Sequence, residues 1–139
     1  MDLGDGAQTL GREVLSGFFA ALLAGSTVQN HVNETARAYG NFEKAGKFPE
    51  GSVIAKDSFS ITETVGILLG SLFVMEKMPR GFNYVSGDWK YSVIKPDGRL
   101  FGETNGKGSG RVEYCITCHL AREAFDHLFF VPEAVRVKR

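Results

Sequence analysis

The sequence predicts an α+β fold: a mainly antiparallel β-sheet, with N-terminal helices before it and a short C-terminal helix that carries a cysteine–histidine motif. Three observations lead to this class. Apolar residues near the N-terminus recur at helical spacing, the middle of the chain is rich in β-favouring residues between turn sequences, and both cysteines lie close together near the C-terminus. At 139 residues the chain is long enough for one hydrophobic core and too short for two ordinary domains.

The composition is that of an ordinary globular protein. Hydrophobic residues make up 43% of the chain and charged residues 23%, which excludes a disordered or fibrous class. The 16 basic and 16 acidic side chains cancel, so electrostatics gives no reason to expect nucleic acid or an anionic membrane as the main partner. No segment has the run of 18 apolar residues that a membrane-spanning helix requires.

The first element predicted is a helix over residues 9–23, ended by Gly25. An export signal is the alternative, because residues 17–25 have the length of the apolar region of a signal peptide. However, Asp2 and Asp5 make the leading flank acidic, whereas an export signal has a basic one. The helix is therefore the favoured interpretation, and no clear export signal is identified.

A second helix is predicted over residues 33–44, with Asn33 as its N-cap and Gly46 as its stop. Strands are then predicted from their β-branched and aromatic content. They cover residues 52–61, 67–78, 89–94 and 100–103. Turn sequences separate them, and K-P-D-G at residues 95–98 makes the last two strands a hairpin.

The C-terminal part begins with a polar, glycine-rich loop at residues 104–110. Its glycine spacing resembles a phosphate-binding loop, but no strand and helix flank it in the order that such a loop requires. A helix is expected over residues 119–125, directly after the cysteines. We find no internal repeat.

The chemistry of the chain is concentrated in Cys115-Ile-Thr-Cys118-His119. The spacing C-x-x-C-H is the attachment signature of a c-type haem. Two thiols separated by two residues can reach both vinyl groups of a porphyrin and form thioethers, and the adjacent histidine then lies beneath the iron. The motif predicts one covalently bound haem c, with Cys115 and Cys118 as anchors and His119 as the axial iron ligand.

Three other interpretations of the motif were weighed. A zinc site needs four ligands, and outside the motif only His31 and His127 offer imidazole nitrogens. A thioredoxin-like dithiol normally follows a strand in a βαβ unit and has no need of the histidine. Two unrelated thiols are the third. The complete pentapeptide and the absence of a second metal half-site in the sequence favour haem over all three.

Four stretches together resemble the cytochrome P-460 and cytochrome c′-beta family. They are F-P-E-G-S-V-I-A-K at residues 48–56, G-D-W at residues 87–89, the haem motif, and D-H-L-F at residues 126–129. The upstream H-V-N at residues 31–33 and Tyr39 are also similar to the family pattern. The resemblance implies that residues 28–139 form a cytochrome P-460-like haem domain. Residues 1–27 form an N-terminal helix or an unusual signal or anchor segment.

The resemblance implies a mainly antiparallel β fold, usually a homodimer, and a haem with histidine on one side and an open sixth position. One branch of the family binds nitric oxide and carbon monoxide without clear catalysis. The other oxidises hydroxylamine, and there a lysine is bonded covalently to the porphyrin edge. Lys56 stands at the position that matches that lysine, which makes it a candidate haem-binding and catalytic residue.

From the residues alone, Lys56 interrupts a strand of apolar and small residues, where a charge ordinarily faces solvent or pairs with a haem propionate. Glu76 is a weaker candidate, as a distal base that would accept protons from hydroxylamine. The alternative for Glu76 is a solvated carboxylate at a strand edge. Three phenylalanines are candidate walls of a distal pocket as well as core residues: Phe59, Phe73 and Phe82.

Two functions follow. The first is a small extracytoplasmic mono-haem cytochrome that binds nitric oxide-like ligands or passes electrons to a redox partner protein. The second is an enzyme that oxidises hydroxylamine or nitric oxide with a lysine-linked haem. Besides His119, the side chains that can bind iron are His31, His127, Met75 and Met78. The first function is favoured because the sequence supplies all its residues, and the periplasmic location is inferred from the covalent haem.

Overall fold

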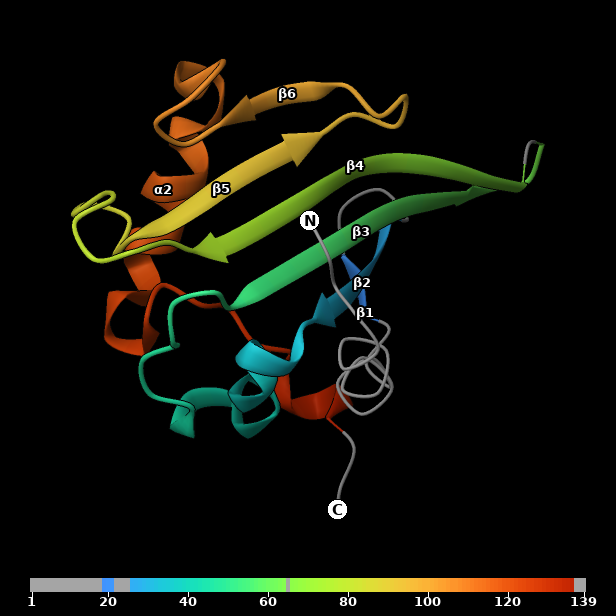
Figure 1. Cartoon of the computed structure of the whole chain (residues 1–139). Coiled ribbons are helices and arrows are strands. Elements are labelled where there is room, and N and C mark those ends of the chain that lie inside the picture. Colours follow the sequence, from blue (N-terminus) through green and yellow to red (C-terminus); the bar gives the residue numbers. More distant parts are fainter. Residues whose placement is uncertain (1–18, 22–25, 65, 137–139) are drawn as a thin grey trace.

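Six antiparallel strands form one sheet in the order β1-β2-β3-β4-β5-β6, so each strand pairs with its neighbour in sequence (Figure 1). The computed structural model describes residues 19–21, 26–64 and 66–136. The strands are β1 Phe19–Ala21, β2 Ser26–Val32, β3 Val53–Thr62, β4 Gly66–Lys77, β5 Trp89–Ile94 and β6 Leu100–Glu103. The predicted α+β class, with a mainly antiparallel sheet, is confirmed.

The helices are short, and most of them follow the sheet in sequence. They are the 3₁₀ helices η1 Glu34–Lys44, η2 Ser109–Val112, η3 Leu120–Phe125 and η4 Glu133–Val135, and the α-helix α2 Glu113–His119. Asn33 caps η1 as predicted, because its side-chain oxygen accepts from the backbone N–H of Ala36. In the described part of the chain, none of the helices is long and apolar enough to cross a membrane.

The N-terminal helix predicted over residues 9–23 is wrong where the structure describes it. Residues 19–21 form strand β1, which pairs with residues 26–28 of β2. The rest of the predicted helix lies outside the described residues. The spacing of apolar residues in a short run does not separate helix from strand, and here pairing with β2, which the sequence analysis did not assign, decides the conformation.

The sheet residues alternate between two faces, and the main core lies on one of them. The buried side chains on this face pack against side chains of the C-terminal segment. The sheet contributes Val32, Ile54, Met75 and Trp89, and the C-terminal segment contributes Val112, Cys115, Leu128 and Val131. Figure 1 shows α2 and the C-terminal segment lying against one side of the sheet. The haem-motif helix is therefore packed over one sheet face.

Candidate functional site

A cavity lies between this sheet face and α2. The register of the sheet places Asn30, Lys56, Phe73 and Val93 in one row across β2 to β5. Side chains two residues apart share a face, so the next row on this face contains Ile54, Met75 and Tyr91. Seven side chains of these two rows line the cavity: Asn30, Ile54, Lys56, Phe73, Met75, Tyr91 and Val93.

The opposite wall of the cavity contains Cys115, Cys118 and His119, all from α2. Residues at i, i+3 and i+4 lie on the same face of an α-helix, so the C-x-x-C-H spacing turns all three side chains toward the sheet. The helix expected over residues 119–125 differs in its start: the α-helix α2 begins at Glu113, before the cysteines, and includes His119, and η3 covers Leu120–Phe125. The cavity has a volume of about 270 Å³, close to the lower end of the roughly 300–1,000 Å³ that ligand and cofactor sites occupy.

The two cysteines are free thiols. Cys115 is buried and Cys118 is exposed. Burial raises the pKa of the Cys115 thiol above its ordinary value. Both sulfurs line the same cavity as His119, so they remain available to a group bound there.

His119 is oriented by a short hydrogen bond. Its Nδ1 lies 2.6 Å from the backbone oxygen of His127, and a carbonyl only accepts, so Nδ1 carries the proton and Nε2 is left to bind a metal. The rings of Tyr91 and Phe129 pack on the imidazole, each with its centroid 5.0 Å away. Burial lowers the pKa of His119, which favours the neutral imidazole that ligates metals.

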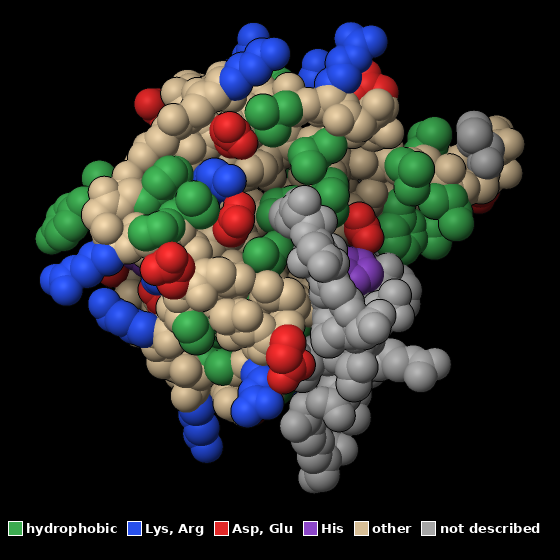
Figure 2. Space-filling model, viewed as in Figure 1, with side chains coloured by type: hydrophobic (Ala, Val, Ile, Leu, Met, Phe, Trp, Pro, Cys, Tyr) green, Lys and Arg blue, Asp and Glu red, His purple; other side chains and the backbone are tan. Residues whose placement is uncertain are grey.

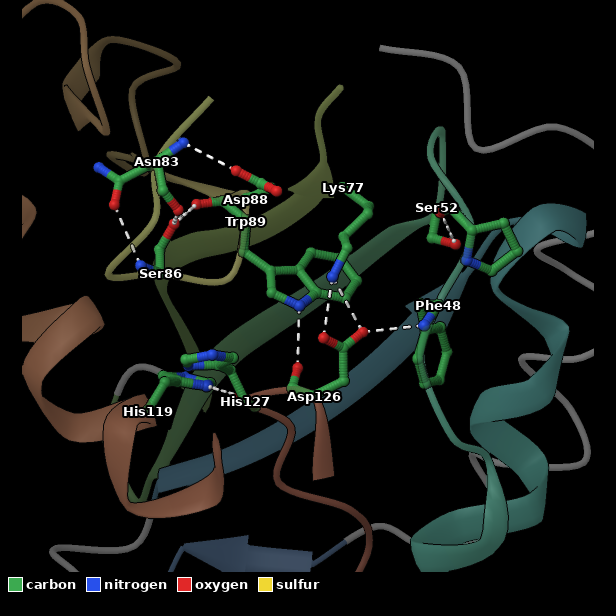
Figure 3. Close-up of polar contacts among 11 residues, drawn as sticks. Phe48, Ser52, Lys77, Asn83, Ser86, Asp88, Trp89, His119, Asp126 and His127 are labelled. Atoms are coloured by element: carbon green, nitrogen blue, oxygen red, sulfur yellow. Dashed lines mark hydrogen bonds and ion pairs between the residues drawn. The ribbon is translucent and has the colours of Figure 1, made fainter. Parts of the chain in front are cut away.

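The family motifs found in the sequence meet behind this histidine (Figure 3). Gly87 has φ +64, and a Cβ there would lie 2.6 Å from Nε2 of His127, so only glycine lets the His127 ring pack so closely. Trp89 Nε1 donates to the backbone oxygen of Asp126 at 2.9 Å. The Phe48 backbone N–H donates to the Asp126 carboxylate at 2.8 Å. The G-D-W, F-P-E-G and D-H-L-F stretches thus form one support for the His127 carbonyl.

Lys56 lies on the inner face of β3 and lines the cavity together with Cys118 and His119. Its side chain is therefore not on the solvated outer face, which is the ordinary place for a strand lysine. Burial lowers the pKa of the Lys56 amine, and Cys118 opposes that shift. A buried amine with a lowered pKa is a better nucleophile than a solvated one.

Glu76 is not brought to the cavity. It lies two residues from Val74 on β4, on the face opposite to Phe73 and Met75, and its carboxylate lies 2.9 Å from Lys90 Nζ. Of the three phenylalanines considered, Phe73 lines this cavity, whereas Phe59 lines a separate hollow near the β3–β4 hairpin. Among the described residues, Phe82 lines neither the cavity nor this hollow.

The four further side chains that can bind iron lie in different places relative to the cavity. His31 points to the opposite sheet face, where its Nε2 lies 2.9 Å from Asp57 Oδ2. His127 is buried behind His119 against Gly87. Met75 lines the cavity, and Met78 is not among its described lining residues. Among the residues that the structure describes, no three His, Cys, Asp or Glu side chains come together in a group that could hold a metal ion.

Two residues that the sequence analysis did not single out carry buried polar atoms in the cavity. Asn30 Oδ1 and the Tyr91 hydroxyl have no hydrogen-bond partner among the described residues. Each such buried group costs about 1–3 kcal/mol when it is left unpaired. Tyr91 could have been found from the alternation of the predicted strand, whereas Asn30 lies in β2, for which no strand was predicted. The unpaired atoms of Asn30 and Tyr91 indicate that a bound group occupies the cavity.

The site thus consists of a sheet face opposite a helix that carries C-x-x-C-H, with a cavity between them. The family model of cytochrome P460 matches residues 24–130. The chain therefore belongs to the cytochrome P460 family, which implies a haem cofactor and iron binding. A comparison with curated proteins finds no match.

The residues present fit a haem. The cavity is lined mainly by apolar side chains, two free thiols and one imidazole face it, and that imidazole is held in the tautomer that leaves Nε2 free. When bound, the haem supplies the iron that takes small ligands or electrons.

Proposed function

We propose that this protein is a small extracytoplasmic c-type cytochrome that holds one covalent haem and binds nitric oxide-like small ligands, transfers electrons, or both. Cys115 and Cys118 are the anchors, each adding its S–H across a vinyl double bond to form a thioether, and His119 is the axial ligand. The observation that carries the proposal is the position of these three side chains on one face of α2, toward an apolar cavity. The extracytoplasmic location follows from the usual place of c-type haem attachment.

An open or weakly held sixth position is supported by the side chains opposite α2. Phe73 and Val93 are apolar, and His31, His127 and Met78 are not among the described residues of the cavity. Of the four further candidate ligands named above, Met75 is the one found among the described residues that line the cavity. Met75 lies in the same row as Tyr91, whose ring packs against His119. We therefore expect Met75 on the side of the haem that His119 occupies, and not at the sixth position of the iron.

Ligand binding is tested by optical spectroscopy of the purified ferrous protein. We expect a high-spin spectrum that changes on addition of carbon monoxide or nitric oxide, because no strong sixth ligand has to be displaced. The matched variant Met75→Leu should give the same spectrum. A low-spin spectrum with a methionine–iron band that disappears in Met75→Leu would instead identify a six-coordinate electron carrier.

An enzyme that oxidises hydroxylamine is the second proposal, supported by the position of Lys56 in the cavity beside Cys118 and His119. Bonding of the amine to the porphyrin edge removes two electrons and two protons, so it needs an oxidant such as a peroxide. Oxidation of hydroxylamine also releases protons, and none of the described residues lining the cavity is Asp or Glu. The lack of a carboxylate there favours ligand binding over catalysis.

Peptide mass spectrometry of the purified protein separates these two functions. We expect the haem peptide with Cys115 and Cys118 to carry no second peptide, and Lys56→Leu to leave the spectrum of an ordinary c-type haem unchanged. If the enzyme proposal is right, the haem peptide is joined to the peptide containing Lys56. Lys56→Leu then restores an ordinary spectrum and removes hydroxylamine oxidation while the thioethers persist.

We also propose that the protein is a homodimer. The far end of the β3–β4 hairpin exposes large apolar side chains, namely Ile61, Ile67, Leu68 and Leu69. Figure 2 shows hydrophobic side chains gathered on the protruding end of the molecule where Figure 1 draws this hairpin. Such a patch is suited to a second copy of the chain, and sedimentation equilibrium should give the mass of two chains.

A further inference from the structure

A buried ion pair lies directly behind the segment that bonds His119. Lys77 Nζ is 2.8 Å from Oδ1 and 3.1 Å from Oδ2 of Asp126. The two side chains are only 12% and 4% exposed. The Phe48 backbone N–H donates to Oδ2 at 2.8 Å, so both carboxylate oxygens have donors. The ammonium also lies 5.0 Å from the ring centroid of Trp89 (Figure 3).

Stability alone does not account for this pair. Removing two charges from water offsets most of their attraction, and a buried ion pair can often be replaced by well-packed apolar residues without loss of stability. The ion pair is therefore better explained by a role in fixing the conformation of the nearby backbone. The backbone at Asp126 indicates which conformation is fixed.

Asp126 and His127 both have left-handed backbone conformations, with φ 52° and 64°. This region costs an L-residue roughly 1–2 kcal/mol, and such residues persist where their surroundings hold them. Asp126 is held through its carboxylate by Lys77 and through its carbonyl by Trp89. Since Asp126 is fixed at both groups, the next carbonyl, that of His127, is directed at Nδ1 of His119, 2.6 Å away.

We propose that the Lys77–Asp126 ion pair is a positioning unit for the axial ligand: it holds the His127 carbonyl against His119 and thereby sets the strength of the bond between His119 and the haem iron. The inference rests on the proposed function, in which His119 ligates that iron. Lys77 and Asp126 are not among the described residues that line the cavity, and they act on His119 through the backbone of Asp126 and His127.

The expected consequence is electronic. A strong hydrogen bond from Nδ1–H to a carbonyl makes the imidazole a stronger donor through Nε2. A stronger axial donor favours ferric over ferrous iron and lowers the reduction potential. Loss of the ion pair lets the left-handed segment relax, which lengthens this hydrogen bond, weakens the iron–histidine bond and raises the potential.

The test compares Lys77→Met and Asp126→Asn with the matched control Lys90→Met in the haem-loaded protein. Lys90 pairs with Glu76 at 2.9 Å. Its removal therefore breaks an ion pair at Glu76, the neighbour of Lys77 on β4, on the opposite sheet face. Two quantities are measured: the frequency of the iron–histidine stretching band in the resonance Raman spectrum of the ferrous protein, and the midpoint reduction potential. A residue that only stabilises the fold is expected to change neither of them.

Both pair variants should shift the iron–histidine band to lower frequency and raise the potential, whereas Lys90→Met should match the unmodified protein. Folded pair variants with the band and potential of the unmodified protein would overturn the proposal. If Lys77→Met does not fold, Asp126→Asn decides alone, because the amide has the size of the carboxylate and can still accept from Phe48. An unmodified ferrous protein without an iron–histidine band would contradict the five-coordinate, His119-ligated haem of the proposed function instead.

Discussion

The double variant Cys115→Ala/Cys118→Ala is expected to lose all covalently bound haem. The two thioethers are the only covalent links in the favoured function, and without them the haem is held only by His119 and apolar contacts. Haem staining after denaturing electrophoresis and acid–acetone extraction should therefore change from full colour to none. The single variant Cys118→Ala keeps one thioether and should retain part of the stain.

Thr117→Ala is the matched control for this experiment. Thr117 lies between the two cysteines in sequence, is exposed, and donates its hydroxyl hydrogen to the backbone oxygen of Glu113 at 3.2 Å. Its removal should leave the stain unchanged. If the double cysteine variant still carries haem that resists extraction, another side chain must be bonded to it, and Lys56 is the one placed for that bond.

Trp89→Ala is expected to have the largest effect on folding. The Trp89 side chain is fully buried at 0% exposure and bonds the backbone of Asp126 through Nε1. Its ring also packs near Phe48, with centroids 6.0 Å apart. Replacing a buried tryptophan with alanine costs about 3–5 kcal/mol, a large share of the roughly 5–15 kcal/mol that stabilises a typical domain.

Urea unfolding of the haem-loaded protein, followed by far-ultraviolet circular dichroism, measures this loss. Tyr84→Ala serves as the control, because Tyr84 is 97% exposed and its removal should change the free energy of unfolding by less than about 0.5 kcal/mol. A loss below about 1 kcal/mol for Trp89→Ala would show that the G-D-W motif does not support the site in the way described.

The sheet could be predicted well from local sequence. Strands β5 and β6 have the predicted bounds, because β5 alternates large inward residues with polar ones and the K-P-D-G turn fixes the hairpin. Gly98 in that turn has φ +87, a conformation for which glycine is suited. Strands β1 and β2 could not be predicted, since their conformation depends on pairing between segments rather than on their own residues.

The arrangement of Cys115, Cys118 and His119 along one cavity could be predicted from five residues, because the C-x-x-C-H spacing brings its side chains together on any helix. What could not be predicted was the direction of single strand residues. Lys56 faces the cavity and Glu76 faces away from it, and this depends on strand register across β3 and β4. The support of His119 through Asp126 depends on contacts far apart in sequence, of which Lys77 to Asp126 spans 49 positions.

Covalent attachment of one haem through Cys115 and Cys118 is tested most directly by mass spectrometry of the unmodified protein after denaturation and acid–acetone extraction. We expect a single species that is heavier than its own polypeptide by one haem. Fragmentation should place that mass on the peptide containing residues 115–119. A species with the mass of the bare polypeptide, accompanied by haem in the organic phase, would contradict the attachment.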